Sequence, residues 1–536
     1  MRLLALAITI CTAVSAASGC VDTTWVNRHD GPASGDDAGL AIALHPQGVV
    51  VAGRHMDTTG QSDFVTMLYD PAGERQWIST YDGSDNGIDE ARAVAIDAAG
   101  NVYVAGPSQG EGTGHDFVTV KYNSSGVEQW VKRLDYEGND DSPNALAVDD
   151  AGNVHVTGFG RGDATDQDWV TVKYDAGGTE QWRRFHDGDM YLYDEAFGIE
   201  TDDAGCVYVV GQSSFPGAYL LDYAVIKYST AGETLFVAEY DGGSYRFDNA
   251  YAMVLDDSGN FYVTGRSYGG ASYDIVTVKY DAAGDRQWVS RYRGSGTGDD
   301  VGRDIVRLGN GDVVVAGYSK GDGTGFDLTA IRYRPESDTA WVRHYNGPAG
   351  SDDFGTAAAT DPEGNIYVAG HSRNASDNDD ILVVKFDGAG NRLWAERYDG
   401  TAQGGDVGYG IAVSGSLEVY VTGKSAGSGT GDDFITIRYG PAAGIEEQVW
   451  SEPAGSFRLS PVTRGLVTVH YSLPEAGPVS VRVFDIAGRT VSDTRSLGHS
   501  VTGSLSVDLQ GLSPGAYLVR LRATGYTATG KIVVNR

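Results

Sequence analysis

Short runs in which apolar and polar residues alternate fill most of the chain, and they return at a regular interval. The stretch DFVTVKYNSSGVEQWV at residues 116–131 is followed by DWVTVKYDAGGTEQWR at 168–183 and by DIVTVKYDAAGDRQWV at 274–289. Alternation over five to seven positions between turn residues predicts short, half-buried β-strands. No segment of the sequence keeps a 3.6-residue apolar period over three turns, which excludes a helical repeat.

The repeat is counted from the glycine that ends the signature VYVAG and its variants. Each copy holds four strand-like runs joined by tight turns with Gly in the position that needs a positive φ. A four-stranded unit repeated about every fifty residues is typical of one blade of a β-propeller. The sequence therefore predicts eight blades, because the signature glycine recurs every 52 to 54 residues, at Gly53, Gly106, Gly158, Gly211, Gly265, Gly317, Gly370 and Gly423.

The two ends of the array predict how the ring closes. The run TWVNRHDG precedes any inner strand, and the last copy supplies only three strands. We expect the N-terminal strand to complete the last blade, which removes the free sheet edges. Trp450, in EEQVWSEP, is the rival for the closing strand. The Trp or Phe in each outer strand is interpreted as a packing residue between blades, since burial of such a ring is strongly stabilising.

Residues 24–440 resemble the bacterial β-propeller repeat family, and the hairpin AVAIDAAGNVYVAG also resembles the NHL type of repeat. A linker at 441–455 leads to residues 456–536, where alternating strands predict a small β-sandwich. LSPGAY at 512–517 and GKIVV at 530–534 resemble the C-terminal sorting domain of type IX secretion cargo, which is similar to the Ig-like domain of hook-capping proteins. This resemblance implies export through the secretion machinery; the alternative is an ordinary sandwich beside the propeller.

The N-terminus, MRLLALAITICTAVSAASGC, has the charge, apolar run and small residues of a signal peptide over residues 1–19. ASGC also resembles a lipoprotein cleavage box, which would make Cys20 an acylation site. No later run reaches about 18 apolar residues, so no helix is expected to span a membrane. These features predict an exported protein that is secreted or attached to the outer cell surface.

Charge and motifs narrow the classes of function. The chain carries 73 acidic and 40 basic residues, a net charge of −33, which disfavours nucleic acid as a partner. The sequence contains no H-E-x-x-H motif and no phosphate loop, so we expect no enzyme and no required cofactor. The alternative is a secreted polysaccharide hydrolase or lyase whose carboxylates come from separate blades.

Aspartates recur at two positions of every repeat, in the loops that topology places on one face. One set opens the third strand, and the other lies 17 residues before each signature glycine. Either backbone N–H groups satisfy the second set, or cations lie among its carboxylates, Ca²⁺ being the natural choice. This possible cation ring consists of Asp36, Asp89, Asp141, Asp194, Asp248, Asp300, Asp353 and Asp406.

The loops around the fourth copy depart most from the repeat. HDGDMYLYDEA at 186–196 and SSFPGAYLLD at 213–222 are both rich in Tyr. A specific ligand site should break the repeat, so the candidate binding residues are Tyr191, Tyr193, Asp194, Tyr219 and Asp222. The favoured hypothesis is a non-catalytic binding or scaffold module for a surface glycan, a protein or a divalent cation; a purely structural array is the remaining alternative.

Overall fold

The computed structural model describes residues 21–534, except 85–86, 162–166, 189–192, 216–219, 244–245, 401, 403, 442–455, 460–465, 473–478, 485–489, 497–501, 509–514 and 524–525. The chain divides into two compact units, Met1–Ala443 and Gly444–Arg536. The described residues form strands, turns and loops but no helix, which confirms the all-β prediction. No helix that could cross a membrane occurs in this part of the chain. The predicted signal peptide, the lipidation candidate Cys20, and Trp450 lie outside the described residues.

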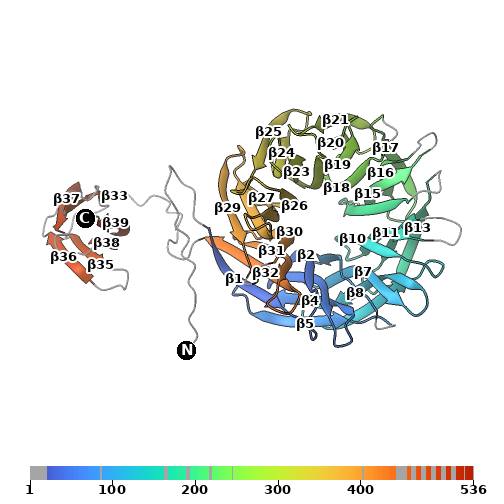
Figure 1. Ribbon diagram of the computed structural model, residues 1–536, viewed down its shortest axis with the longest axis horizontal. Helices are drawn as coiled ribbons and strands as arrows, with labels where there is room; N and C mark the ends of the chain where they lie inside the picture. Colours follow the sequence, from blue (N-terminus) through green and yellow to red (C-terminus); the bar gives the residue numbers. More distant parts are fainter. Residues whose placement is uncertain are drawn as a thin grey trace. The chain divides into compact units, whose positions relative to one another are not determined.

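The first unit is an eight-bladed β-propeller of four-stranded antiparallel blades around a central opening (Figure 1). Blades one to four are β2–β5 (Ala38–His45, Gly48–Met56, Ser62–Tyr69, Arg75–Tyr81), β6–β9 (Ala93–Ile96, Val102–Gly110, Gly114–Tyr122, Glu128–Leu134), β10–β13 (Ser142–Val148, Val154–Gly160, Asp168–Tyr174, Glu180–His186) and β14–β17 (Glu195–Thr201, Val207–Ser214, Leu221–Tyr228, Thr234–Tyr240). Blades five to seven are β18–β21 (Asn249–Leu255, Phe261–Tyr268, Tyr273–Tyr280, Arg286–Tyr292), β22–β25 (Val301–Arg307, Val313–Lys320, Phe326–Tyr333, Thr339–Tyr345) and β26–β29 (Asp353–Thr360, Ile366–Arg373, Asp379–Phe386, Arg392–Tyr398).

The eighth blade is completed from the other end of the chain. It holds β30 (Asp406–Val413), β31 (Val419–Ala426) and β32 (Asp432–Pro441), and its outer strand is β1 (Val21–His29). β1 pairs antiparallel with β32 from Val21 opposite Pro441 to His29 opposite Phe434. This pairing confirms that the N-terminal strand closes the ring, and it leaves β32 without a free edge.

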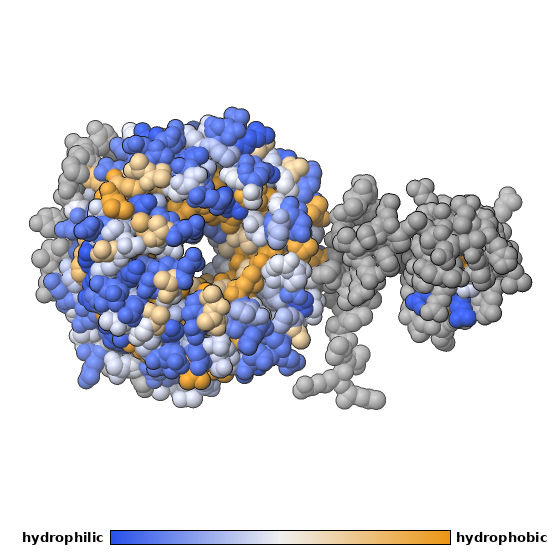
Figure 2. Space-filling view, turned by 180° about the vertical axis from the view of Figure 1, so that it is seen from behind, coloured by the Kyte–Doolittle hydropathy of each residue, from blue (hydrophilic) through white to orange (hydrophobic). Residues whose placement is uncertain are grey.

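The cores lie between successive blades. One cluster joins Val50 and Phe64 of blade one to Val102, Val104 and Val118 of blade two, all fully buried. The second and third strands of each blade are buried on both sides, which explains their nearly continuous apolar runs. Figure 2 shows one end of the propeller, where hydrophilic residues surround most of the central opening.

The repeated Trp residues lie between blades, as the packing interpretation predicts. The ring of Trp130 in blade two contacts Tyr103 of its own blade and Tyr174 of blade three, both with centroids 6.0 Å apart. Its Nε1–H donates to the carbonyl oxygen of Ala176, at 3.2 Å, in a turn of blade three. Gly178 of that turn lies beneath the ring, where a Cβ atom would come within 2.9 Å of it. The same contact explains why both the Trp and the turn Gly recur.

The second unit contains two antiparallel sheets. The first is β33 (Ser456–Leu459), β34 (Leu466–Ser472) and β37 (Thr502–Asp508); the second is β35 (Val479–Phe484), β36 (Thr490–Ser496), β38 (Gly515–Ala523) and β39 (Tyr526–Val534). Val469 and Val507 of the first sheet, and Val481 and Val519 of the second, are fully buried. Two small sheets that both bury valine agree with the predicted sandwich.

Candidate functional site

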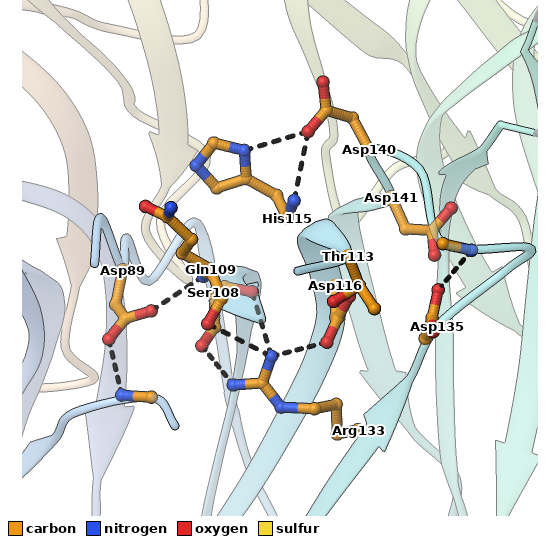
Figure 3. A network of polar contacts seen from close by, with 12 residues as sticks. Asp89, Ser108, Gln109, Thr113, His115, Asp116, Arg133, Asp135, Asp140 and Asp141 are labelled. Carbon is orange, nitrogen blue, oxygen red and sulfur yellow. Dashed lines mark hydrogen bonds and ion pairs between the residues drawn. The ribbon is translucent and has the colours of Figure 1, made fainter. Parts of the chain in front are cut away.

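The Asp that precedes each innermost strand is buried and clamped by backbone N–H groups. Asp89 accepts one hydrogen bond from the N–H of Gly83, at 2.6 Å, and one from that of Gln109, at 3.0 Å (Figure 3). Gly83 ends the previous blade and Gln109 lies in the second strand of the next one, so the carboxylate ties two blades together. Equivalent bonds from the preceding segment, 2.5 to 2.8 Å long, reach Asp141, Asp194, Asp248, Asp300, Asp353 and Asp406.

In the first blade this position belongs to Asp37, and the assignment of Asp36 from residue counting is wrong. Asp37 is fully buried and accepts N–H groups of Gly31 and Met56, at 2.6 and 2.7 Å, whereas Asp36 is exposed. The reason is the turn between β2 and β3, which spans only two residues and is shorter than the corresponding turn of the other blades. Counting back 17 residues from Gly53 therefore reaches Asp36, one residue before the buried Asp37.

Burial is the main influence on the titration of these carboxyl groups. Desolvation raises the pKa of Asp194 to about 6 and that of Asp141 to about 7, against the lowering effect of their backbone hydrogen bonds. The set lies inside the blade junctions, with exposed fractions of 0 to 1% for Asp37 and its seven equivalents. Backbone N–H groups supply hydrogen bonds to Asp37 and to each of its seven equivalents. This is the first of the two arrangements considered for the set, in which the backbone rather than a cation satisfies the carboxylates.

The second Asp of each repeat, which opens the third strand, meets an arginine in half of the blades. In blade two Asp116 accepts a charged hydrogen bond from Arg133, at 2.6 Å, and Arg133 also bonds Ser108 (Figure 3). Arg133 lies three residues after the repeated Trp of the outer strand. The same pairing occurs between Arg291 and Asp274, Arg397 and Asp380, and Arg28 and Asp433, with N–O distances of 2.7 to 3.5 Å.

Among the described residues, five junctions bring three carboxylates together, and two of these groups include an Asp that is paired with arginine. Each group takes one Asp from the third strand, one from the end of the outer strand and one from the buried set, with oxygen atoms within 4.8 Å of one another. The groups are Asp63/Asp82/Asp89, Asp116/Asp135/Asp141, Asp168/Asp187/Asp194, Asp222/Asp241/Asp248 and Asp380/Asp399/Asp406. Carboxylate oxygens in this number are ligands that Ca²⁺ accepts.

The structure separates the candidate binding residues of blade four. Tyr191 and Tyr219 lie outside the described residues. Tyr193 is 52% exposed, whereas Asp194 and Asp222 are buried, with exposed fractions of 0 and 6%. Only Tyr193 of the described three is therefore free to meet a large ligand, while the two aspartates belong to the carboxylate groups of the junctions.

Tyr193 borders a hollow of about 360 Å³ between blades four and five. Its apolar lining includes Phe197, Phe247 and Tyr251, and its polar lining is Gln212, Asn249 and Arg266. The polar groups are fixed by one another: the Arg266 Nε–H donates to Asn249 Oδ1 at 2.9 Å, and the Asn249 amide donates to Gln212 Oε1. The guanidinium also lies over the ring of Tyr273, 4.6 Å from its centroid.

Phe197 and Tyr251 occupy a position that residue counting did not single out. Each is the extra residue of a β-bulge in the innermost strand, at the register shifts between Ala196 and Gly198 and between Ala250 and Ala252. Bulges redirect a side chain and are common beside functional sites. The bulge recurs in other blades, where the extra residue is Leu40, Asn144, Arg303, Thr356 or Tyr409. The bulge position therefore keeps its backbone conformation from blade to blade while its side chain varies, and this variation within a regular repeat was the signal that the sequence offered.

Two further carboxylates lie on innermost strands of separate blades, Glu200 on β14 and Asp304 on β22. Burial, together with the charge of Asp304, raises the pKa of Glu200 to about 7. Burial likewise raises the pKa of Asp304 to about 6, although its Oδ2 accepts the N–H of Ala358 at 2.8 Å. Within this pair, Glu200 is therefore the carboxyl group that can exchange a proton near neutral pH.

Comparison with protein families gives two matches. Residues 461–535 match the Secretion system C-terminal sorting domain, and residues 129–159 match the Beta-propeller repeat. A comparison with curated proteins gives no match.

Among solved structures, Sqt1 from Chaetomium thermophilum is 13% identical, with a TM-score of 0.49, over 78% of this chain and 99% of that one. A PL25 ulvan lyase bound to a GlcA–Rha3S saccharide is 13% identical, with a TM-score of 0.40, over 76% and 95% of the two chains. At these values the likenesses support no conclusion about what this chain does.

Fold and family matches together define the class: this is an exported β-propeller of four-stranded blades. More specifically, the chain combines a match to the Beta-propeller repeat, in the second and third blades, with a type IX secretion C-terminal sorting domain. Proteins with this domain are handed to the secretion machinery, and the protein is secreted or attached to the outer cell surface.

Proposed function

We propose that the exported propeller is a binding module and that its ligand site is the hollow between blades four and five. The observation that carries this proposal is the lining: three aromatic rings, those of Phe197, Phe247 and Tyr251, surround a small set of polar groups. Ligand sites commonly combine an aromatic wall with a few fixed hydrogen-bonding groups. Tyr193, 52% exposed, and Phe247, 39% exposed, supply large apolar surface at its rim.

The ligand class that this lining fits is an acidic saccharide. Sugar rings can stack on aromatic faces, while the side-chain amides of Gln212 and Asn249 suit hydroxyl groups. The terminal nitrogens of Arg266 have no hydrogen-bond partner among the residues that the structure describes, so they are available to a carboxylate or sulfate. An arginine here is notable in a chain with a net charge of −33, because that charge otherwise repels anions.

The test measures binding of the full chain to acidic and neutral oligosaccharides by isothermal titration calorimetry. The variants are Phe247→Ala and Tyr193→Ala, and Ile88→Ala is the matched control. Ile88 directly precedes the buried Asp89, as Phe247 precedes Asp248, and it is 50% exposed. We expect each rim variant to weaken binding about tenfold or more and the control to leave it unchanged. Absence of binding to any saccharide, or an equal loss in Ile88→Ala, would contradict the proposal.

Polysaccharide cleavage is the second candidate, and the observation that favours it is a pair of interacting carboxyl groups from separate blades, Glu200 on β14 and Asp304 on β22. A general acid or base should titrate near the working pH, and a carboxyl group with a pKa of about 7 meets that requirement. The discriminating assay follows the release of reducing or unsaturated ends from the oligosaccharides that bind. Turnover that disappears in Glu200→Gln while binding persists would establish the enzyme; binding without turnover supports the binding module.

A further inference from the structure

Among the residues that the structure describes, the carboxylates at the junction of blades four and five lack the arginine partner found in four other blades. Oxygen atoms of Asp222, Asp241 and Asp248 lie within 4.8 Å of one another. Asp222 is 6% exposed and Asp248 is fully buried, while Asp241 faces solvent. Three carboxylates this close repel one another strongly unless a cation or bound protons neutralise them.

Asp222 is the residue that points to a ligand. The residue is more than nine-tenths buried, its carboxylate lies within the group of three, and it has no hydrogen-bond or ion-pair partner among the described residues. A buried carboxylate normally pairs with a cationic side chain or binds a metal ion. Four counterparts of Asp222 pair with a cationic side chain. They are Asp116, Asp274, Asp380 and Asp433, which are bonded to Arg133, Arg291, Arg397 and Arg28.

Blades four and five provide a natural comparison. The position opposite the third strand holds arginine in four blades, Arg28, Arg133, Arg291 and Arg397, but Glu239 in blade four. Blade five also replaces the outer-strand Asp by Arg293, which bonds Asp274 at 3.2 Å. Blade five therefore balances Asp274 and Asp300 with two arginines, whereas blade four combines Asp222, Asp241 and Asp248 with a fourth negative residue, Glu239.

We propose that Asp222, Asp241 and Asp248 bind a divalent cation, Ca²⁺ by preference, in the place where blade five uses arginine. Ca²⁺ favours several carboxylate oxygens and tolerates irregular geometry, which suits ligands from three separate segments. Asp248 is already oriented by the N–H groups of Gly242 and Tyr268, at 2.6 and 3.1 Å. In support, burial and the charges of Asp241 and Asp248 raise the pKa of Asp222 to about 7, the behaviour of a carboxyl group without a counter-ion.

The cation site adjoins the proposed saccharide hollow without depending on it. Leu221 and Asn249, the chain neighbours of Asp222 and Asp248, both line the hollow. A cation that joins β16 to the segment before β18 would hold these two walls together. The ion is nevertheless assigned from the carboxylates alone, so its binding is measured with no saccharide present, and the two proposals can fail separately.

The experiment titrates the full chain, stripped with chelator, with Ca²⁺ by calorimetry and with Tb³⁺ by luminescence sensitised by nearby tyrosines. Asp222→Asn removes a ligand, and Glu239→Arg installs the arginine of blade five at an exposed position. Asp116→Asn is the matched control, because the same position in blade two is served by Arg133. Thermal unfolding with and without Ca²⁺ accompanies each titration.

We expect the wild-type chain to bind Ca²⁺, with a dissociation constant of about 10⁻⁴ to 10⁻³ M as in other extracellular modules. Asp222→Asn and Glu239→Arg should each lower the number of bound ions by one, or weaken one site at least tenfold, and Asp116→Asn should not. Glu239→Arg should also raise the unfolding temperature of the ion-free chain, which shows that this variant folds. No binding by the wild type, or the same binding in Glu239→Arg as in the wild type, would overturn the proposal.

Discussion

Replacing Gly178 by alanine tests whether the repeated Trp and the repeated turn Gly hold neighbouring blades together. Gly178 has a φ of +82°, and a Cβ atom there would lie 2.9 Å from the ring of Trp130 and 2.7 Å from Lys132 Cε. The left-handed conformation costs an alanine roughly 1–2 kcal/mol. Displacing the Trp130 ring adds overpacking of roughly 1–3 kcal/mol. We therefore expect Gly178→Ala to lower the free energy of unfolding by about 2–5 kcal/mol in total.

Gly364→Ala is the matched control for the conformational part of this effect. Gly364 also occupies a turn with positive φ, +81°, but no atom lies within 4 Å of the position where its Cβ would be. Only the cost of the left-handed conformation applies there, so the expected loss is roughly 1–2 kcal/mol. The difference between the two variants isolates the contact with Trp130.

The assay is urea unfolding of the chain, followed by circular dichroism so that the signal does not depend on Trp130. Repeat arrays can depart from two-state behaviour, so the comparison uses variants whose transitions keep the wild-type slope. A lower midpoint for Gly178→Ala than for Gly364→Ala is the predicted result. Equal midpoints would show that the Trp130 contact adds nothing to the cohesion of blades two and three.

Three further predictions concern charge and closure. Arg133→Met leaves Asp116, 2% exposed, without its cation and should cost roughly 3 kcal/mol in urea unfolding, part of which Asp116→Asn in the same chain should restore. Burial raises the folded-state pKa of Asp63 and Asp222 from 3.8 to about 7, so the folded chain binds these protons more tightly than the unfolded chain does. In the presence of chelator, the protein should therefore lose stability as the pH rises from about 4 to about 7. If replacing both residues by Asn changes the urea midpoint by the same amount at pH 5 and at pH 7, the prediction is contradicted. Deleting Val21–His29 exposes the edge of β32 and should lower the unfolding temperature and promote self-association in size-exclusion chromatography, whereas an unchanged monomer would show that closure is dispensable.

Much of the fold could be predicted because its information is local. Alternating residues define each strand, the Asp-x-x-Gly turns define each hairpin, and the spacing of Gly53 and its equivalents counts the blades. The N-terminal strand could be assigned to the eighth blade by counting strands, as the pairing of β1 with β32 confirms. Asp36 does not take the buried position of the first blade, because a turn one residue shorter places Asp37 there instead.

The ligand site was less accessible to such reasoning. Sequence irregularity pointed to blade four, and Tyr193 does border the hollow, but Phe197, Tyr251 and Arg266 were not anticipated. Phe197 and Tyr251 belong to bulges, and a bulge is defined by its pairing with another strand rather than by its own residues. Glu239 likewise acquires its meaning only beside Asp222, since the register of β16 and β17 places it where other blades carry arginine.

The sequence by itself determined the strands, the eight blades, the closing strand and the sorting domain, because each is encoded by residues close together in the chain or by a repeated count. Tertiary structure alone decided which carboxylates meet, which of them find an arginine, and where aromatic side chains form a hollow. The physical reason is that a blade junction joins segments from two repeats, and the charge balance and packing at that junction depend on all of them at once.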